Sequence, residues 1–221
     1  MQINFFMLKT TIFSAKDLEN KVLSNLPGYY DIEGWLMPNE AVALYTIANS
    51  ISTQHPIVCE IGSWQGKSAY VLASAIKGKK GKLYVIDPFD GSGDIASVST
   101  YHKNMDKLGV TLLENFQSNM KKFGVMNVID IMAMKSDEAR TNFYEEQINM
   151  LFIDGNHEYE FVKKDYELWE SLIMKGGVLV LHDVGAKHVD GPLRVMEEYI
   201  KNNPQWCNIS IVGEMCIAYR S

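Results

Sequence analysis

Short apolar runs alternate with helical stretches along most of this chain, and this alternation limits its fold more than any other feature. Runs with the length and β-branched content of buried strands lie at 56–62, 82–87, 127–134, 148–154 and 176–183. The stretches between them predict helices at 67–76, through 116–123, at 137–146 and at 160–173. Strands that alternate with helices predict a doubly wound α/β fold with a mainly parallel sheet.

The C-terminal part of the chain completes this predicted sheet. A helix at 192–202 is followed by two apolar runs at 208–214 and 215–221, which form a closing antiparallel pair. We therefore predict a seven-stranded sheet with an antiparallel last strand.

The segment before the first strand carries helical patterns at 16–27 and 38–52. We predict a helical cap or lid at 1–55 and a main domain at 56–221, which together form one compact domain. The Gly/Ser-rich stretch at 90–99 predicts a polar loop, and we expect the loop at 90–105 to close over the substrate.

Glycines 176 and 177 predict the stop of the helix before the fifth strand. The strand itself would then run from these glycines to the acid at its end.

Four of the predicted strands end in an acid, namely Glu60, Asp87, Asp154 and Asp183. An isolated buried carboxylate is very costly, so each of these groups must be paired, hydrogen-bonded or bound to a metal. In a doubly wound sheet, ligands bind beyond the carboxyl ends of the strands, near the point where the strand order reverses. The four acids therefore predict one site at that edge.

A glycine loop, CEIGSWQGKS at 59–68, joins the first strand to the next helix. A nicotinamide-binding loop requires G-x-G-x-x-G, which is absent, and a P-loop requires one more residue between Gly62 and Gly66. The remaining alternative is an S-adenosylmethionine loop followed by a second acid for the ribose, and Asp87 follows Gly66 by about 20 residues. A P-loop-like nucleotide hydrolase stays open as a rival at this point.

Composition excludes several other classes of function. The net charge of −6 gives no basic footprint for nucleic acid, and no apolar run has the length of a membrane span. The opening MQINFFML lacks the basic region and cleavage site of a signal peptide. The three cysteines form no metal-spaced pair; Cys207 and Cys216 can face each other in the terminal hairpin, but reduced thiols are expected. We predict a cytoplasmic protein with neither nucleic-acid nor membrane partners, and a homodimer on general grounds.

Three segments carry a resemblance to a known family: VCEIGSWQGKSAYVLA, LYVIDPFDG and LFIDGNHEYEFVKKDYELWESLIMKGGVLVLHDV. They resemble class I S-adenosylmethionine-dependent methyltransferases, over roughly residues 56–190. Within that class the chain is similar to the branch that holds metal-dependent macrolide-sugar O-methyltransferases and cephalosporin-hydroxylase-like proteins. The resemblance implies a Rossmann-like fold and S-adenosylmethionine as cofactor.

The resemblance also implies roles for particular residues. The cofactor would be bound by Glu60, Gly62, Ser63, Gly66, Ser68, Asp87, Ser136 and Asp154. Of these, Asp87 would hold the ribose and Ser136 would contact the adenine. A divalent metal, magnesium or manganese, would be held by Asp154 and Asp183, with His182 either as a third ligand or as a neighbour that orients a loop without touching the metal. His182 departs from the family, which has an acid there, and imidazole suits zinc, iron or manganese better than magnesium.

The residue types fit methyl transfer to a hydroxyl group. A divalent ion at Asp154 and Asp183 would position the acceptor and lower the pKa of its hydroxyl. A neutral His157 would take the proton as general base, because its ordinary pKa lies near neutral pH. The predicted function is an S-adenosylmethionine-dependent O-methyltransferase for a hydroxylated small molecule, such as a sugar or a natural-product intermediate. The alternatives are the nucleotide hydrolase and a non-catalytic cofactor-binding scaffold of the same fold.

Overall fold

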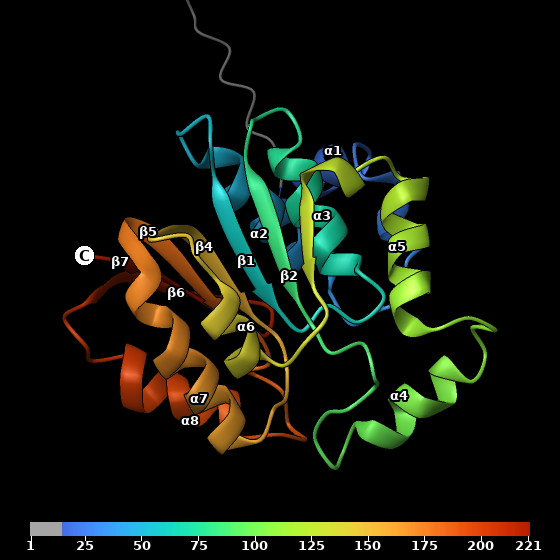
Figure 1. Cartoon of the computed structure of the whole chain (residues 1–221). Coiled ribbons are helices and arrows are strands. Elements are labelled where there is room, and N and C mark those ends of the chain that lie inside the picture. Colours follow the sequence, from blue (N-terminus) through green and yellow to red (C-terminus); the bar gives the residue numbers. More distant parts are fainter. Residues whose placement is uncertain (1–14) are drawn as a thin grey trace, which may run out of the picture.

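Seven strands form a single sheet in the computed structural model, which describes residues 15–221. The strands are β1 (Ile57–Ile61), β2 (Lys82–Ile86), β3 (Ile129–Met132), β4 (Ile148–Ile153), β5 (Ile173–Leu181), β6 (Trp206–Val212) and β7 (Met215–Arg220). Their order is β3-β2-β1-β4-β5-β7-β6 (Figure 1). Strands β1 to β5 pair in parallel, and β7 runs antiparallel to both of its neighbours. The predicted mainly parallel sheet with a reversed last strand is confirmed.

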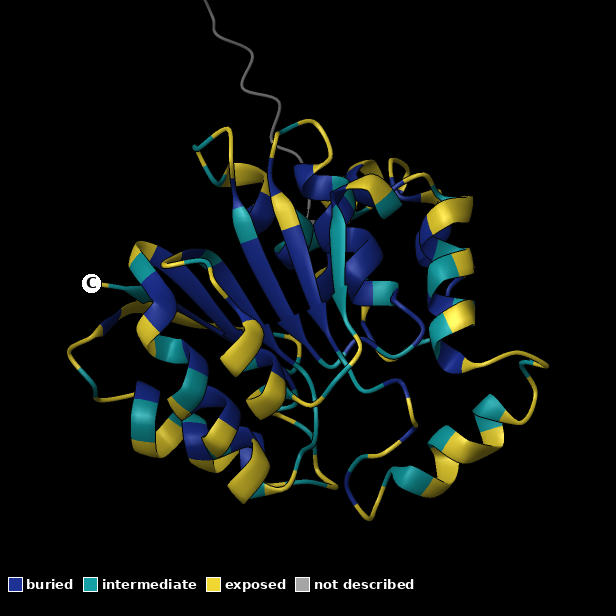
Figure 2. Cartoon of the chain, viewed as in Figure 1, coloured by how far each residue is buried: buried dark blue, intermediate teal, exposed yellow. Residues whose placement is uncertain are grey.

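Alternate residues of the buried strands face opposite layers of helices, as the period of two requires. In β1, Val58 packs in one core, whereas Cys59 and Ile61 pack in the other. The first core lies under α1 (Ala15–Leu23), α2 (Pro38–Ser50), α3 (Lys67–Ile76) and α5 (Leu112–Lys122). The second lies under α6 (Ser136–Asn142), α7 (Tyr159–Trp169) and α8 (Gly191–Val195). Figure 2 shows the buried strands between these two layers of helices, whose outer faces are exposed.

The strand order reverses beside β1, because the chain passes from β1 outward to β2 and β3 and then returns to β4 on the other side. Backbone hydrogen bonds continue past the strand ends: Gly62 N–H donates to Ile86, Asp154 N–H to Ile61, and His182 N–H to Ile153. The residues that follow these strands are therefore aligned at one carboxyl edge. This is the edge where doubly wound folds bind ligands.

A helix that the sequence did not predict, α4 (Val98–Met105), follows the polar loop at 90–99. Asp94 starts it, because its side chain accepts the N–H of Ser97 at 2.9 Å. None of the α4 residues is fully buried, and Figure 1 shows the helix standing off from the sheet beyond the carboxyl ends of β1 and β2. Val98, Tyr101 and Met105 have helical spacing, but the Gly, Ser and Asp residues at 90–99 favoured a loop, so the sequence prediction missed this helix.

The region before β5 also differs from the prediction. Helix α7 ends at Trp169 and a 3-10 turn covers Glu170–Leu172, after which β5 begins at Ile173. Gly176 and Gly177 therefore lie inside the strand, where its pairing with β4 is irregular, and do not stop the helix. The predicted helix at 192–202 is a short α8 followed by a π-helical turn, Met196–Ile200.

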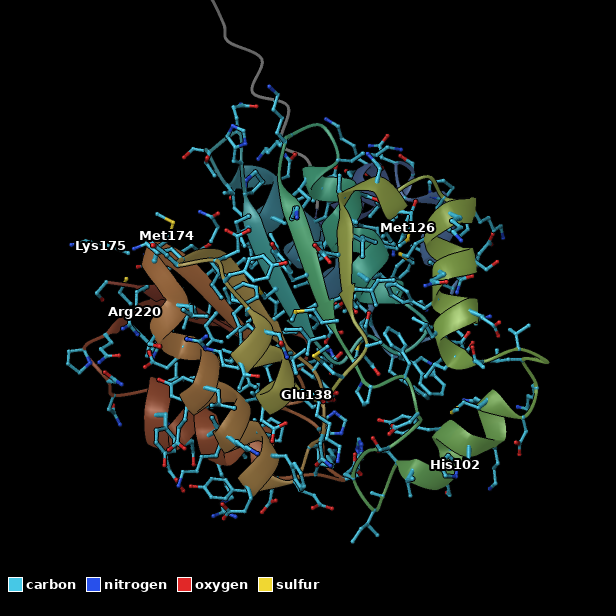
Figure 3. The ribbon with its side chains drawn as sticks, viewed as in Figure 1. His102, Met126, Glu138, Met174, Lys175 and Arg220 are labelled. Atoms are coloured by element: carbon cyan, nitrogen blue, oxygen red, sulfur yellow. The ribbon has the colours of Figure 1, made fainter. Side chains whose placement is uncertain are left out.

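The two edges of the molecule hold no part of the predicted site. In Figure 3, His102 lies on α4 at one side and Arg220 at the end of β7 on the other. Arg220 pairs with Glu170 at 2.5 Å and so ties the last strand to the turn after α7. In the β6–β7 pair, Cys207 lies opposite Tyr219 and Cys216 opposite Ile211, so the two cysteines do not face each other. Both thiols, and that of Cys59, are free.

Among residues 15–221, no helix has the length and apolar character needed to cross a bilayer. The opening segment on which the signal-peptide prediction rests lies outside the described residues.

Candidate active site

A cavity of about 970 Å³ opens at the carboxyl edge of the sheet. Its wall is built from the segment 33–37 before α2, the glycine loop, the loop 91–101, and the turns after β2, β4 and β5. This volume is at the upper end of the range for cofactor and ligand sites. It is large enough for a cofactor and a small acceptor side by side.

The glycine loop is held tightly against the end of β4. Gly62 has a φ of +83°, and a Cβ on it would lie 2.1 Å from the carbonyl oxygen of Asp154. The carboxylate of Asp87 accepts the N–H groups of Ser63 at 2.8 Å and Trp64 at 3.0 Å. Trp64 itself is held at a φ of +51°, which is uncommon for a residue with a side chain. Because Asp87 already binds these two N–H groups, the loop does not offer them to a phosphate.

Gly62→Ala is expected to destabilise the chain by at least about 3 kcal/mol, because its methyl group would overlap the backbone of Asp154 and strain a positive φ. Gly78→Ala is the matched control, since a Cβ there meets nothing within 4 Å. Urea unfolding of both variants measures the difference. Equal stability of the two would show that the loop tolerates a side chain at residue 62.

Most of the predicted cofactor residues line the cavity. These are Gly62, Ser63, Ser68, Asp87, Ser136 and Asp154. Glu60 and Gly66 are not part of the wall: Glu60 is fully buried under the loop, and Gly66 packs against Phe116 and Met120. The hydroxyl of Ser136 accepts Nε1–H of Trp169 at 2.9 Å, so part of its hydrogen-bonding capacity is used within the protein.

Glu60 is a buried acid with one unsatisfied oxygen. Its Oε2 accepts the hydroxyl of Ser63 at 2.8 Å, whereas Oε1 has no partner among the described residues. Burial raises its pKa to about 8, although hydrogen bonds from Ser68 and Ser63 oppose the rise. At neutral pH this side chain is therefore mainly protonated, and hence uncharged.

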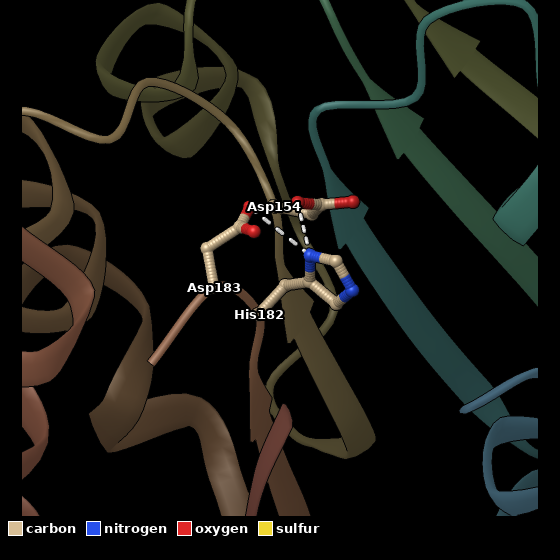
Figure 4. A group of neighbouring side chains, drawn as sticks. All are labelled: Asp154, His182 and Asp183. Carbon is tan, nitrogen blue, oxygen red and sulfur yellow. Dashed lines mark hydrogen bonds and ion pairs between the residues drawn. The ribbon is translucent and has the colours of Figure 1, made fainter. Parts of the chain in front are cut away.

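Asp154, His182 and Asp183 form the centre of a polar cluster beyond β4 and β5 (Figure 4). Nδ1 of His182 lies 3.2 Å from Oδ1 of Asp154 and 3.1 Å from Oδ2 of Asp183. Figure 4 shows the ring presenting Nδ1 to both carboxylates and Nε2 to the opposite side. Asp183 has a φ of +58°, a strained geometry of the kind that functional sites often retain.

His157 extends this cluster toward the loop 91–101. Its Nδ1 is hydrogen-bonded to Asp94 at 2.8 Å, and its Nε2 lies 3.0 Å from Oδ2 of Asp183 and 3.9 Å from Oδ1 of Asp154. The approach to Asp183 does not have hydrogen-bond geometry, so the buried Nε2 has no hydrogen-bond partner among residues 15–221. Asp94 thus orients the imidazole so that Nε2 faces Asp154 and Asp183.

The carboxylates dominate the electrostatics of the cluster. Burial lowers the pKa of His157, but Asp154 and Asp183 outweigh it and raise the value to about 10. The same acids and Glu40 raise the pKa of His182, again against the effect of burial. Burial would raise the pKa of Asp183, but the two histidines lower it well below its usual range. With protein groups alone, both histidines are protonated at neutral pH.

The three central residues fit a divalent metal ion. One ligand atom from each of Asp154, His182 and Asp183 can be chosen so that all lie within 4.8 Å of one another. Two carboxylates and one imidazole are a donor set for a first-row transition ion. Such an ion would replace the proton that Nδ1 of His182 otherwise carries.

A family described as a methyltransferase domain matches residues 59–184, which include the glycine loop and the whole polar cluster. The chain belongs to this family. Its members are class I methyltransferases, so the resemblance in the sequence is confirmed.

One curated relative is an uncharacterized protein, R132, of Acanthamoeba polyphaga mimivirus. It is 30% identical over 146 residues, which are 63% of this methyltransferase-family chain and 57% of the viral protein. The chain thus spans little more than half the length of that relative.

Two solved structures show the same fold. The O-methyltransferase TomG of Streptomyces achromogenes, involved in tomaymycin synthesis and solved with S-adenosylmethionine, has a TM-score of 0.62 at 14% identity, covering 96% of this chain and 92% of that one. An O-methyltransferase of Bacillus cereus, solved with S-adenosylhomocysteine, has a TM-score of 0.61 at 14% identity, covering 96% and 94%.

The sequence did not indicate two members of the cluster, Glu40 and Asp94. Glu40 lies in α2 and resembles an ordinary capping-box acid, and Asp94 lies in a stretch without periodicity. Both reach the site through tertiary contacts. The sequence contains one weak indication of their role, because each is an acid at or near the start of a helix.

Three aromatic side chains meet on the cavity wall. The ring of Trp64 lies 5.8 Å from that of Trp35 and 5.1 Å from that of Tyr101, and Trp35 and Tyr101 are 5.6 Å apart. These separations are those of favourable aromatic pairs. They join the segment before α2, the glycine loop and α4.

Proposed function

We propose that this chain transfers the methyl group of S-adenosylmethionine to a hydroxyl group of a small molecule. The observation that carries the proposal is the position of His157, whose Nε2 faces Asp154 and Asp183 in the same cavity as the glycine loop. A base and a cofactor loop that share one cavity are what methyl transfer to oxygen requires.

The cofactor would lie along the glycine loop. Asp87 lies at the end of β2, where a ribose would reach its carboxylate, and Ser63 and Ser68 line the wall beside it. The proposed cofactor supplies an electrophilic methyl group. The chain has to bind it, exclude water and align the acceptor oxygen with it.

His157 would accept the proton of the acceptor hydroxyl at Nε2, while Asp94 holds the ring through Nδ1. A divalent ion held by Asp154, His182 and Asp183 would act as a Lewis acid on that hydroxyl and, through its charge, lower the pKa of His157. The histidine is therefore a proton acceptor only in the loaded site. His157 therefore differs from the base predicted from the sequence, whose pKa would be near neutral without a bound ion.

The acceptor would lie between His157 and the three aromatic rings. An apolar wall of Trp35, Trp64 and Tyr101 suits a ring-shaped hydroxylated molecule, such as a sugar or a natural-product intermediate. A cytoplasmic location, a homodimer, the division at residue 55, and the exclusion of nucleic-acid and membrane partners remain predictions.

Calorimetric titration with S-adenosylmethionine tests the cofactor half of the proposal. Wild-type chain is expected to bind with micromolar affinity, and Asp87→Ala to lower that affinity at least tenfold, because it removes the ribose ligand and frees two loop N–H groups. Asp130→Ala is the control, since its side chain is 42% exposed and forms a salt bridge with Lys82 away from the cavity wall. A panel of hydroxylated acceptors, assayed by release of S-adenosylhomocysteine, then tests the transfer.

Binding of ATP and magnesium with no response to S-adenosylmethionine would contradict the proposal. Binding of the cofactor without turnover of any acceptor would favour a non-catalytic scaffold instead.

A further inference from the structure

Glu40 is a buried acid of α2 that lies behind the metal-site residue His182. It is 1% exposed, and its Oε2 lies 3.2 Å from Nε2 of His182. This is the ring nitrogen that faces away from Asp154 and Asp183 in Figure 4. Glu40 therefore contacts the site from the side opposite to the cavity carboxylates.

The carboxylate of Glu40 is fixed from three directions. Oε2 also accepts the N–H of Met37 at 2.8 Å, and Oε1 accepts the N–H of Glu214 at 2.7 Å. The turn between β6 and β7 is packed closely on it, because a Cβ on Gly213 would lie 2.3 Å from Oε1. A carboxylate held in this way has little freedom to rotate, so it also fixes the histidine that it contacts.

The contact matters once an ion lies between Asp154 and Asp183. Nδ1 of His182 must then carry a lone pair, so the remaining proton of the imidazole lies on Nε2, where the carboxylate of Glu40 accepts it. Nδ1 then carries the lone pair, and it is Nδ1 that lies 3.2 Å and 3.1 Å from Asp154 and Asp183. Metal-bound histidines usually donate their other N–H to a carboxylate in the same manner, which also raises ligand basicity.

We propose that Glu40 is a positioning residue that makes Nδ1 of His182 a metal ligand, so that the site prefers a first-row transition ion such as Co²⁺ or Mn²⁺ to Mg²⁺. This rests on the metal-assisted part of the proposed function. It goes further because it assigns Glu40, a residue of the N-terminal segment, to the choice of metal. An imidazole ligand disfavours Mg²⁺, which takes oxygen ligands.

Glu40→Gln separates this role from a purely structural one. The glutamine keeps the size of the side chain and an oxygen for a backbone N–H, but its amide can donate to Nε2 of His182. That contact favours the tautomer with the proton on Nδ1, which cannot bind a metal. The matched control is Glu114→Gln, because Glu114 occupies the same capping-box position of α5 and contacts no histidine.

The experiment is calorimetric titration of the chelator-treated full chain with Co²⁺ and with Mg²⁺, together with the visible absorption of the Co²⁺ form. Wild-type chain and Glu114→Gln are expected to bind one Co²⁺ per chain, at least tenfold more tightly than Mg²⁺. Glu40→Gln should weaken Co²⁺ binding by about 10–100-fold and change the absorption bands, while its affinity for S-adenosylmethionine stays within about twofold. The unchanged cofactor affinity shows that the variant is folded.

Two results would overturn the inference. Co²⁺ affinity of Glu40→Gln within about twofold of wild type would make Glu40 a helix-capping acid only. Wild-type chain that binds S-adenosylmethionine but not Co²⁺, or binds Mg²⁺ as tightly as Co²⁺, would reject the assigned metal preference and leave the methyl-transfer proposal standing. Failure to bind the cofactor at all is the separate result that contradicts the proposed function.

Discussion

His157→Ala is expected to lower kcat for methyl transfer by about 10²–10⁴-fold, with little change in affinity for S-adenosylmethionine. The side chain is 11% exposed and stands next to the carboxylates of the polar cluster, away from the loop segment held by Asp87. Its loss removes the proton acceptor and leaves the cofactor wall intact. Steady-state release of S-adenosylhomocysteine from an acceptor found in the screen gives kcat, and calorimetry gives the affinity.

Asp94→Asn sharpens the same test. An asparagine amide can donate to Nδ1 of His157, which would place the proton on Nε2 and leave no lone pair for the acceptor hydroxyl. We expect at least a tenfold loss of kcat. His102→Ala is the control, because His102 lies on the exposed side of α4 (Figure 3). If His157→Ala keeps more than a tenth of wild-type kcat, another group removes the proton.

Glu60→Gln is expected to remove a large pH dependence of stability. The pKa of Glu60 is raised from 4.5 to about 8 by burial, so the folded chain holds a proton that the unfolded chain releases. The unfolded state therefore binds fewer protons between these two values, and the free energy of unfolding falls as the pH rises through this window. From pH 5 to pH 8, wild-type chain should lose roughly 3 kcal/mol relative to Glu60→Gln.

Urea unfolding of both proteins at pH 5 and pH 8 measures this difference. Glu146→Gln is the control for an exposed acid. A constant gap between wild type and Glu60→Gln across the two pH values would mean that Glu60 is ionised throughout, with its charge compensated inside the fold.

The strands, and the edge of the sheet that carries the site, could be predicted from the sequence because they depend on local patterns. The apolar runs that end in Asp87, Asp154 and Asp183 have the length and composition of buried strands, and the parallel pairing brings their ends together. The glycine at position 62 likewise indicated a tight turn. These parts depend on the sequence within a few residues of each position.

Helix α4 and the contact of Glu40 with His182 could not be predicted, because they depend on contacts between distant segments. Helix α4 has only a short apolar stripe of Val98, Tyr101 and Met105, and its place in the fold depends on Asp94, which accepts the N–H of Ser97, and on Tyr101, which packs against Trp64. Glu40 reaches His182 across 142 positions of sequence. No period or spacing in the sequence could have indicated either contact.

The protonation of His157 could not be predicted for a similar reason. As an isolated side chain it has a pKa of 6.5, which favoured a neutral base. The structure places Asp154 and Asp183, which follow β4 and β5, beside it, and these acids raise its pKa to about 10. The identity of a residue sets its ordinary pKa, but the neighbours that shift it come from the whole fold.

The three rings of the aromatic cluster, Trp35, Trp64 and Tyr101, come from different segments of the chain. Two of its three rings come from the segment before α2 and from α4, which lie outside the strand-and-turn framework that would hold the cofactor. Exchanging 33–37 and the part of α4 around Tyr101 between homologous chains is therefore expected to alter acceptor choice in the proposed enzyme, while Asp94, which orients His157, stays in place. In the proposed enzyme, a change of acceptor would then require new aromatic side chains at these positions only, and the groups that bind the cofactor and move the proton would be kept.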